Sequence, residues 1–185
     1  TPIGELFDVK KQIVLENFVP RGGNVSSYEL QVISLIIANT FPKNLLEIGT
    51  FDGTTTLQMA LNSPSNATIH TLDLPEEITK TALPTLDHDI SYIQDKQKNS
   101  RKFENSAIKR KVFQHFGDSA TYDFKKFSLK NPIDFCFIDG GHAYEIVKSD
   151  TEKTLPLMNK GGTICWHDVD HKSVSVSYTH LRAHE

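Results

Sequence analysis

The sequence predicts an α/β fold, in which a doubly wound, mostly parallel sheet carries helices on both faces. Short apolar runs of strand length alternate with longer amphipathic stretches along most of the chain. The short runs are largely apolar rather than alternating, as is typical of strands that are covered on both faces. The length of 185 residues suits one domain, and the sequence shows no internal repeat or domain boundary.

The predicted helices and strands follow in regular alternation. Ser26 and Ser27 are candidate N-caps for a helix in which Leu30, Ile33 and Ile37 recur at helical spacing. We expect strands at 44–49, 66–74, 109–119, 132–141 and 162–169, and further helices at 54–62, 121–129 and 144–159, the last of them ended by Gly161 and Gly162.

Two stretches fall outside this alternation. The polar stretch 75–103 contains Pro75 and Pro84, so we expect a connector with short helical pieces that could form part of a lid. Residues 175–185 lack periodicity and resemble translated vector or adaptor sequence. We therefore expect a domain of residues 1–174 that lacks its natural C-terminus, followed by a non-native tail.

The composition gives no reason to expect a strongly charged partner. Apolar residues make up 38% of the chain, charged residues make up 23%, and the formal net charge is −3. This balance favours neither nucleic acid nor an anionic membrane as a partner, and no apolar run approaches the roughly 20 residues that span a bilayer. Cys136 and Cys165 lie inside apolar runs, which favours free core thiols and a reducing, cytoplasmic location.

Each predicted strand ends at or near a carboxylate. In chain order, these carboxylates are Glu47, Asp73, Asp118, Asp139 and Asp168. In a parallel sheet of this kind, ligands bind at the carboxyl ends of the strands. A single aspartate in such a place is often only a turn residue, but five together indicate a binding site.

The junction between the first strand and the next helix combines Glu47 with two glycines, Gly49 and Gly53. Glycines let a backbone approach a ligand closely, although a tight turn alone would also explain them. The spacing departs from the dinucleotide motif G-x-G-x-x-G, and Glu47 would repel a pyrophosphate. An NAD(P)-binding oxidoreductase is therefore the disfavoured alternative, and a cationic or hydrogen-bond-donating ligand fits better.

Five stretches in order resemble the motifs of class I S-adenosylmethionine-dependent methyltransferases: LLEIGTFDGTTT, TLDLP, FGDS, IDFCFIDGGHAYEIVKSD and LPLMNKGGTICWHDVD. The last two resemble the subgroup with F-I-D-G-x-H-x-Y and W-H-D motifs, which is related to small-molecule and sugar O-methyltransferases. The resemblance covers about residues 25–172. It implies a Rossmann-like fold whose usual C-terminal strand pair lies beyond this chain. A non-catalytic, truncated cofactor-binding fragment stays open as an alternative.

The resemblance also implies contacts with S-adenosyl-L-methionine. Gly49 and Gly53 would pass the methionine portion, Asp73 would accept hydrogen bonds from the ribose hydroxyls, and Asp118 with Ser119 would reach the adenine edge. The complete set of expected cofactor-binding residues is Glu47, Gly49, Thr50, Phe51, Gly53, Thr55, Asp73, Asp118, Ser119 and Asp139.

His142 and Asp139 are the candidate catalytic residues. The resemblance implies that His142 is the general base, and an imidazole with a pKa near neutrality suits that task. The alternative for His142 is a helix-capping role. His70, His88 and His115 are assigned no role.

Asp139 and Asp168 would repel each other at adjacent strand ends unless a cation lay between them, and related enzymes place Mg²⁺ there. Val169 stands where several relatives carry Asn or Asp, and His167 is a poor ligand for Mg²⁺. The sequence therefore leaves open whether Mg²⁺ binds at this place. The sequence as a whole predicts O-methylation of a small-molecule or sugar hydroxyl, and a homo-oligomer also stays open.

Overall fold

The computed structural model describes residues 3–19, 21–75, 77–78, 80–95, 101–127 and 131–168. Within these ranges one parallel sheet has the order β3-β2-β1-β4-β5. The reversal of strand order between β1 and β4 confirms the doubly wound, Rossmann-like α/β fold. The expected tail at 175–185 lies outside the described residues. The strands are β1 (Asn44–Ile48), β2 (Thr68–Asp73), β3 (Val112–Phe116), β4 (Ile133–Ile138) and β5 (Met158–Trp166).

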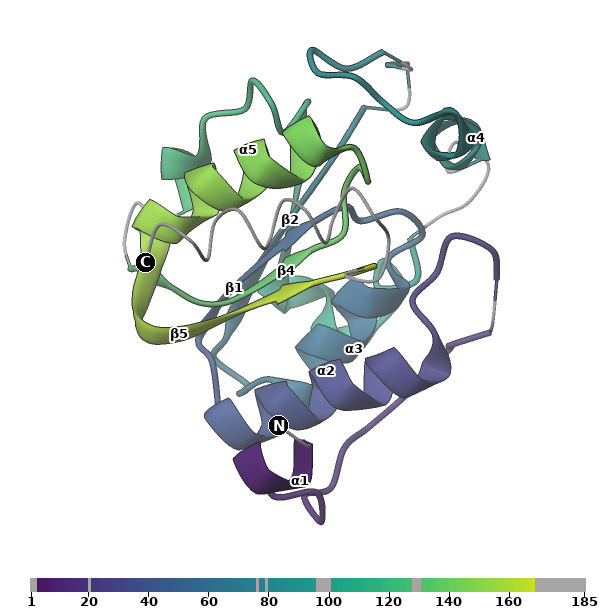
Figure 1. Ribbon diagram of the computed structural model, residues 1–185. Coiled ribbons are helices and arrows are strands. Elements are labelled where there is room, and N and C mark those ends of the chain that lie inside the picture. The colour runs from purple at the N-terminus through teal and green to yellow at the C-terminus, as the bar shows by residue number, and fades with distance from the viewer. Residues whose placement is uncertain are drawn as a thin grey trace.

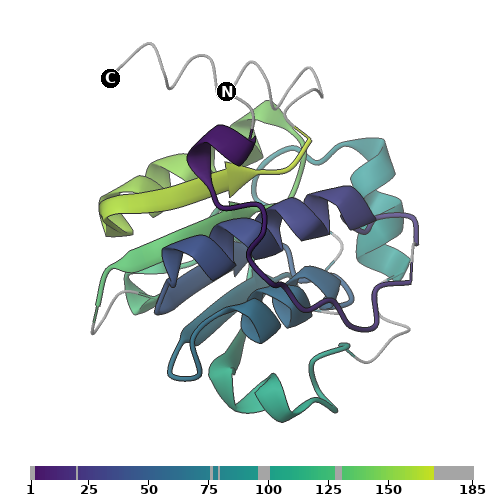
Figure 2. The ribbon, with the colours of Figure 1, turned by 90° about the horizontal axis from the view of Figure 1, so that it is seen from below.

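Helices cover both faces of the sheet (Figure 1). α2 (Ser27–Thr40) and α3 (Thr54–Asn62) lie side by side over one face, as Figure 2 shows, and α5 (Tyr144–Thr154) lies over the other. Successive side chains of a strand point to opposite faces, so Leu45 and Leu46 pack into two different core clusters, and both are fully buried. The two-sided cover explains why the strands are apolar throughout.

The start of α2 is fixed by a capping box. Ser26 Oγ accepts a hydrogen bond from the Glu29 backbone N–H at 3.3 Å, and Glu29 Oε2 accepts one from the Ser26 backbone N–H at 2.9 Å. Of the two candidate caps, the structure therefore uses Ser26 rather than Ser27.

The helix predicted at 121–129 is wrong in length. Among the described residues, this stretch forms only a short 3-10 helix, η3 (Phe124–Phe127). Asp123 Oδ1 accepts a hydrogen bond from the Lys125 backbone N–H at 3.2 Å. This bond has the geometry of an N-cap, so it fixes the helix start at Phe124 instead of the predicted residue 121.

The predicted end of the helix at 144–159 is also wrong. α5 stops at Thr154 and is followed by a short 3-10 helix, η4 (Leu155–Leu157), whose Pro156 has no N–H to continue the α-helix. β5 already begins at Met158, so Gly161 and Gly162 lie inside this strand. Gly161, with φ of 83°, falls where the pairing of β4 with β5 shifts register, as expected of a bulge.

The remaining helical segments are α1 (Ile3–Leu6), α4 (Asp87–Asp95) and the 3-10 helix η2 (Ala107–Lys111). α4 is the expected helical piece of the polar connector, and it lies beside the carboxyl ends of the strands (Figure 1). None of the described helices has the length and apolar character that crossing a membrane requires.

The two cysteines are free, as expected. Cys136 is fully buried in β4, and Cys165 is partly buried in β5. Burial raises the pKa of both thiols, that of Cys165 to about 12, so neither forms a thiolate readily.

Candidate functional site

A cavity of about 310 Å³ opens at the carboxyl ends of all five strands. Its wall is completed by α4 and by the loop before α2. Six of the predicted cofactor-binding residues line it, namely Gly49, Phe51, Asp73, Asp118, Ser119 and Asp139, together with the catalytic candidate His142 and with Asp168. The other four are buried and are not part of its lining: Glu47 in β1, Thr50 and Gly53 in the turn, and Thr55 in α3.

The glycine turn after β1 is shaped first by close packing inside the protein. Gly49 has φ of 97°, and a Cβ there would lie only 2.0 Å from the Asp139 backbone oxygen. Gly53 has φ of 76°, and a Cβ there would lie 2.7 Å from the Phe103 ring. Glycine is therefore required at both positions whether or not a ligand binds. The tight-turn explanation holds, and Gly49 also lines the cavity.

Glu47 lies under the cavity rather than in its wall. Its side chain is completely buried, and Oε2 accepts hydrogen bonds from the hydroxyls of Thr56 and Thr71, each at 2.5 Å. Burial, with smaller contributions from the charges of Asp139 and Asp73, raises the pKa of Glu47 to about 8 despite these two bonds. The carboxyl group therefore orders the turn as a largely protonated group at neutral pH.

Asp73 and Asp118 both line the cavity and both bind backbone N–H groups. Asp73 Oδ2 accepts from Phe51 at 3.2 Å, which joins the end of β2 to the glycine turn. Asp118 Oδ2 accepts from Ala82 at 2.6 Å, so it ties the loop after β3 to the connector. Both aspartates thus have the turn-forming role that their position alone would predict, and both remain at the cavity wall.

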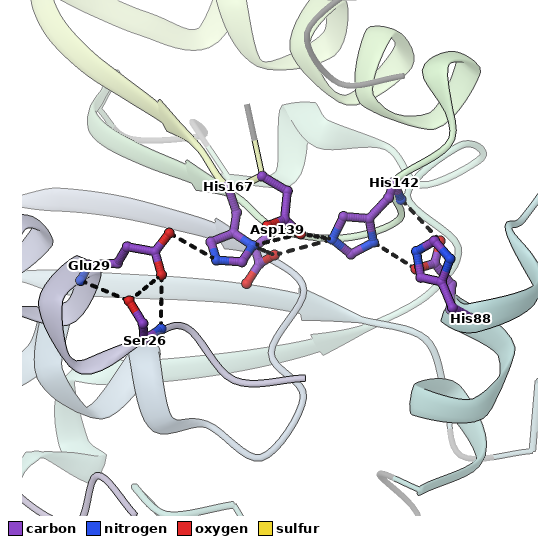
Figure 3. A network of polar contacts seen from close by, with 8 residues as sticks. Ser26, Glu29, His88, Asp139, His142 and His167 are labelled. Atoms are coloured by element: carbon purple, nitrogen blue, oxygen red, sulfur yellow. Dashed lines mark hydrogen bonds and ion pairs between the residues drawn. The ribbon is translucent and has the colours of Figure 1, made fainter. Parts of the chain in front are cut away.

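A chain of alternating carboxylates and imidazoles crosses the ends of β4 and β5 (Figure 3). His167 Nδ1 lies 3.1 Å from Asp139 Oδ1 and 3.2 Å from Asp168 Oδ2. His142 Nε2 lies 2.8 Å from Asp168 Oδ2. At its two ends, His167 Nε2 lies 3.5 Å from Glu29 Oε1 and His142 Nδ1 lies 2.6 Å from an oxygen of Asp89.

The carboxylates raise the pKa of both imidazoles. Burial alone would lower the pKa of His167, but its hydrogen bond to Asp139 and the surrounding negative charges raise it to about 9. The pKa of His142 is also raised against burial, chiefly by the hydrogen bond and charge of Asp89. His167 is therefore a cation at neutral pH, and it lies where the repulsion between Asp139 and Asp168 must be offset.

This donor set fits Mg²⁺ poorly. Mg²⁺ prefers about six oxygen ligands, whereas Asp139 and Asp168 are in contact with the nitrogens of His142 and His167. Asp139, His142 and His167 form one group whose ligand atoms could hold an ion, and this mixture of nitrogen and oxygen suits transition metals better than Mg²⁺. The prediction of Mg²⁺ at Asp139 and Asp168 thus lacks support in the donor set.

Sequence reasoning missed the contribution of the connector. His88 and Asp89 of α4 both line the cavity, and Asp89 contacts His142, which follows it by 53 positions. Neither stands at a strand end, and no local motif marks them. Only the strand-end histidine of this group, His142, carried a signal in the sequence.

Solved structures with this fold include several methyltransferases. Cofactor-bound Rv0187 from MTB is 16% identical, with a TM-score of 0.62 over 88% of this chain and 71% of that chain. The O-methyltransferase from Bacillus cereus in complex with SAH is 21% identical, with a TM-score of 0.60 over 88% and 72% of the two chains. The O-methyltransferase TomG from Streptomyces achromogenes in complex with SAM is 18% identical, with a TM-score of 0.59 over 86% and 70%.

At these identities the likeness concerns the fold, and no curated protein matches the sequence. A family model is more specific. The model described as a methyltransferase domain matches residues 46–169, from within β1 to just past β5, and so includes all five strand ends that open into the cavity. The chain belongs to this methyltransferase-domain family.

Proposed function

We propose that the protein transfers a methyl group from S-adenosylmethionine to a hydroxyl of a small molecule, with His142 as the general base. The observation that carries this proposal is the position of His142, whose Nε2 lies 2.8 Å from Asp168 in the wall of the strand-end cavity. The family match supports methyl transfer, and the bound SAH and SAM of similar structures support the cofactor.

We assign each part of the cofactor to a different part of the cavity wall. Asp73 at the end of β2 is the candidate partner of the ribose hydroxyls, and the loop at Asp118 and Ser119 is the candidate adenine wall. Gly49 and Asp139, which also line the cavity, are the candidate contacts of the methionine portion. Glu47 orders this wall from below instead of meeting the ligand, since it is completely buried.

When bound, the cofactor would supply an electrophilic methyl group on a sulfonium. The acceptor oxygen forms the new bond to carbon as the carbon–sulfur bond breaks, and the hydroxyl proton passes to His142 Nε2. Asp168 is the exposed partner of His142, with 39% of its side chain accessible, so the acceptor hydroxyl would take the place of this contact. The raised pKa of His142 means that its neutral, basic form gains population as pH rises.

The acceptor class is the least constrained part of the proposal. A net charge of −3 favours a small-molecule or sugar hydroxyl over nucleic acid or an anionic membrane. Free cysteines fit a cytoplasmic enzyme, and a homo-oligomer is compatible with the fold.

Titration calorimetry with S-adenosylhomocysteine and with NADH tests the cofactor. We expect binding of S-adenosylhomocysteine only, and binding of NADH alone would overturn the proposal. Transfer of radiolabelled methyl to catechol, para-nitrophenol and methyl glucoside then tests catalysis. His142→Ala should lose roughly 10²–10⁴-fold in turnover with little change in cofactor affinity. Cofactor binding without transfer to any of the probes would instead favour the cofactor-binding fragment.

A further inference from the structure

Asp89 of α4 holds His142 at two points. Asp89 Oδ2 accepts a hydrogen bond from the His142 backbone N–H at 3.1 Å, and Asp89 Oδ1 lies 2.6 Å from His142 Nδ1. The Asp89 residue is only 5% exposed, although it lies on a short helix of the connector. One buried carboxylate therefore fixes both the backbone and the ring of the proposed base.

The chemistry of the two side chains assigns the ring proton. An ionised carboxylate can only accept hydrogen bonds, and a neutral imidazole donates from one nitrogen and accepts at the other. The nitrogen that faces Asp89 therefore carries hydrogen in both the cationic and the neutral ring. In the cation Nε2 also carries hydrogen, toward Asp168, and in the neutral ring Nε2 is the basic nitrogen. Nε2 is also the nitrogen near Asp168, on the side where the ends of β4 and β5 meet the cavity.

The two carboxylate partners of His142 differ in burial and in restraint. Asp89 is further held by His88, whose Nε2 lies 3.3 Å from Asp89 Oδ1. Burial alone would raise the pKa of Asp89, but its hydrogen bonds from His142 lower it, so it stays ionised at neutral pH. Asp168 is the more exposed partner. The contact with Asp89 is therefore the permanent one, and the contact with Asp168 is the one that an acceptor could replace.

We propose that Asp89 is a positioning residue for His142, which sets the Nδ1–H tautomer and aims Nε2 at the acceptor. This inference rests on the proposed function. It also gives α4 a task beyond covering the cavity, because the base is correctly oriented only while α4 is docked at the ends of the strands.

Asp89→Asn is the main test, and Asp87→Asn is its matched control. Asp87 lies in the same first turn of α4 and is exposed, so its substitution removes the same charge without touching His142. In Asp89→Asn the amide can donate to Nδ1 and so favour the opposite tautomer, with hydrogen on Nε2. We expect turnover of the catechol probe to fall by roughly 10²-fold or more, with the affinity for S-adenosylhomocysteine unchanged.

A double variant separates positioning from a general loss of structure. In the His142→Ala background, Asp89→Asn should cause no further fall in turnover, because the group through which Asp89 acts is gone. Asp89→Glu keeps an accepting carboxylate and should recover part of the lost turnover. An additional loss in the double variant, or wild-type turnover in Asp89→Asn beside an inactive His142→Ala, would overturn the role of Asp89 and leave the proposed function intact.

A spectroscopic measurement decides the matter without an acceptor. At a pH above the raised pKa of His142, where its ring is neutral, nitrogen-15 spectra of histidine-labelled protein with bound S-adenosylhomocysteine should show hydrogen on Nδ1 and none on Nε2 of His142, in the wild type and in Asp87→Asn. Asp89→Asn should move it to Nε2, and Asp89→Glu should restore it. A wild-type ring without hydrogen on Nδ1 would overturn the inference. Active His142→Ala would instead refute the base in the proposed function, and the spectra would still test the contact.

Discussion

The turn after β1 and the ends of β4 and β5 form adjoining parts of the same cavity wall, and their acidic groups are stabilised differently. Beneath the turn, the Glu47 carboxyl group has only hydroxyl groups as hydrogen-bond partners, and its pKa is raised to about 8. At the ends of β4 and β5, Asp139 and Asp168 contact the imidazole of His167, whose own pKa is raised to about 9. The region of the β1 turn is therefore nearly uncharged and rigid. The ends of β4 and β5 keep charged groups that can take part in proton transfer.

This difference suits the division of labour that we propose. Cofactor binding needs a wall of fixed shape, which backbone contacts and glycines supply. Proton transfer needs titratable side chains that keep defined partners, which the alternating carboxylates and imidazoles supply. Four predictions test this contrast, from the largest expected effect to the smallest.

Gly49→Ala should destabilise the turn after β1. The added methyl would lie 2.0 Å from the Asp139 backbone oxygen at a residue with φ of 97°, so both overpacking and backbone strain arise. We expect a loss of roughly 2–5 kcal/mol in the free energy of unfolding, measured by urea denaturation. Gly22→Ala is the control, because a Cβ there meets nothing within 4 Å. Equal stability of the two variants would contradict the packing that we describe.

Glu47→Gln should change how stability depends on pH. The pKa of Glu47 is raised from 4.5 to about 8, so the unfolded chain ionises this group first and the wild type loses stability as pH rises across that window. The contribution is on the order of a few kcal/mol. The variant cannot ionise there, so its stability relative to wild type should increase from acidic to alkaline pH. A constant difference between the two proteins would show that Glu47 is ionised in the fold.

His167→Gln should lower the free energy of unfolding, over a narrower pH range than the one in which Glu47→Gln acts. The pKa of His167 is raised from 6.5 to about 9, so the stabilisation is fully present below 6.5 and is lost as pH rises through about 9. We expect a cost on the order of 1–3 kcal/mol at mildly acidic pH that vanishes at the alkaline end. Unlike the effect of Glu47→Gln, this cost should shrink in high salt, because it depends on charge pairs. Thermal unfolding at several pH values measures it.

Mg²⁺ should have the smallest effect of all. The two imidazoles already contact the carboxylates to which an Mg²⁺ ion would bind, so we expect no rise in melting temperature when MgCl₂ replaces KCl at equal ionic strength. A rise that saturates with Mg²⁺ and disappears in Asp168→Asn would restore the metal to this site.

The sequence predicted the parts of the site that depend on strand ends. In a parallel sheet the carboxyl ends lie at one edge, so a carboxylate at the end of each run is enough to place Asp73, Asp118 and Asp139 together. The same rule did not show that Glu47 is completely buried and lies outside the cavity wall. Side chains alternate along a strand, and Glu47 points into the protein toward Thr56 of α3.

The role of Asp89 could not be predicted, because it depends on how the connector folds back over the sheet. The contact with His142 joins residues 53 positions apart and follows from no local pattern. The predicted limits of η3 and α5 were wrong for a different reason. Asp123 caps a helix that begins only at Phe124, and Pro156 lacks the N–H that would continue α5.

The capping box of α2 connects the helix to the ends of the strands, because Glu29 of the box also contacts His167. Glu29 Oε2 accepts a hydrogen bond from the Ser26 backbone N–H, and Glu29 Oε1 lies 3.5 Å from His167 Nε2, so one carboxylate contacts both the helix start and this imidazole. Deprotonation of His167 removes a cation from this shared group. Fraying of the first turn of α2 is thereby linked to the protonation state of the site, and amide exchange at Leu30, whose N–H binds the Ser26 carbonyl, reports on that state from outside the cavity.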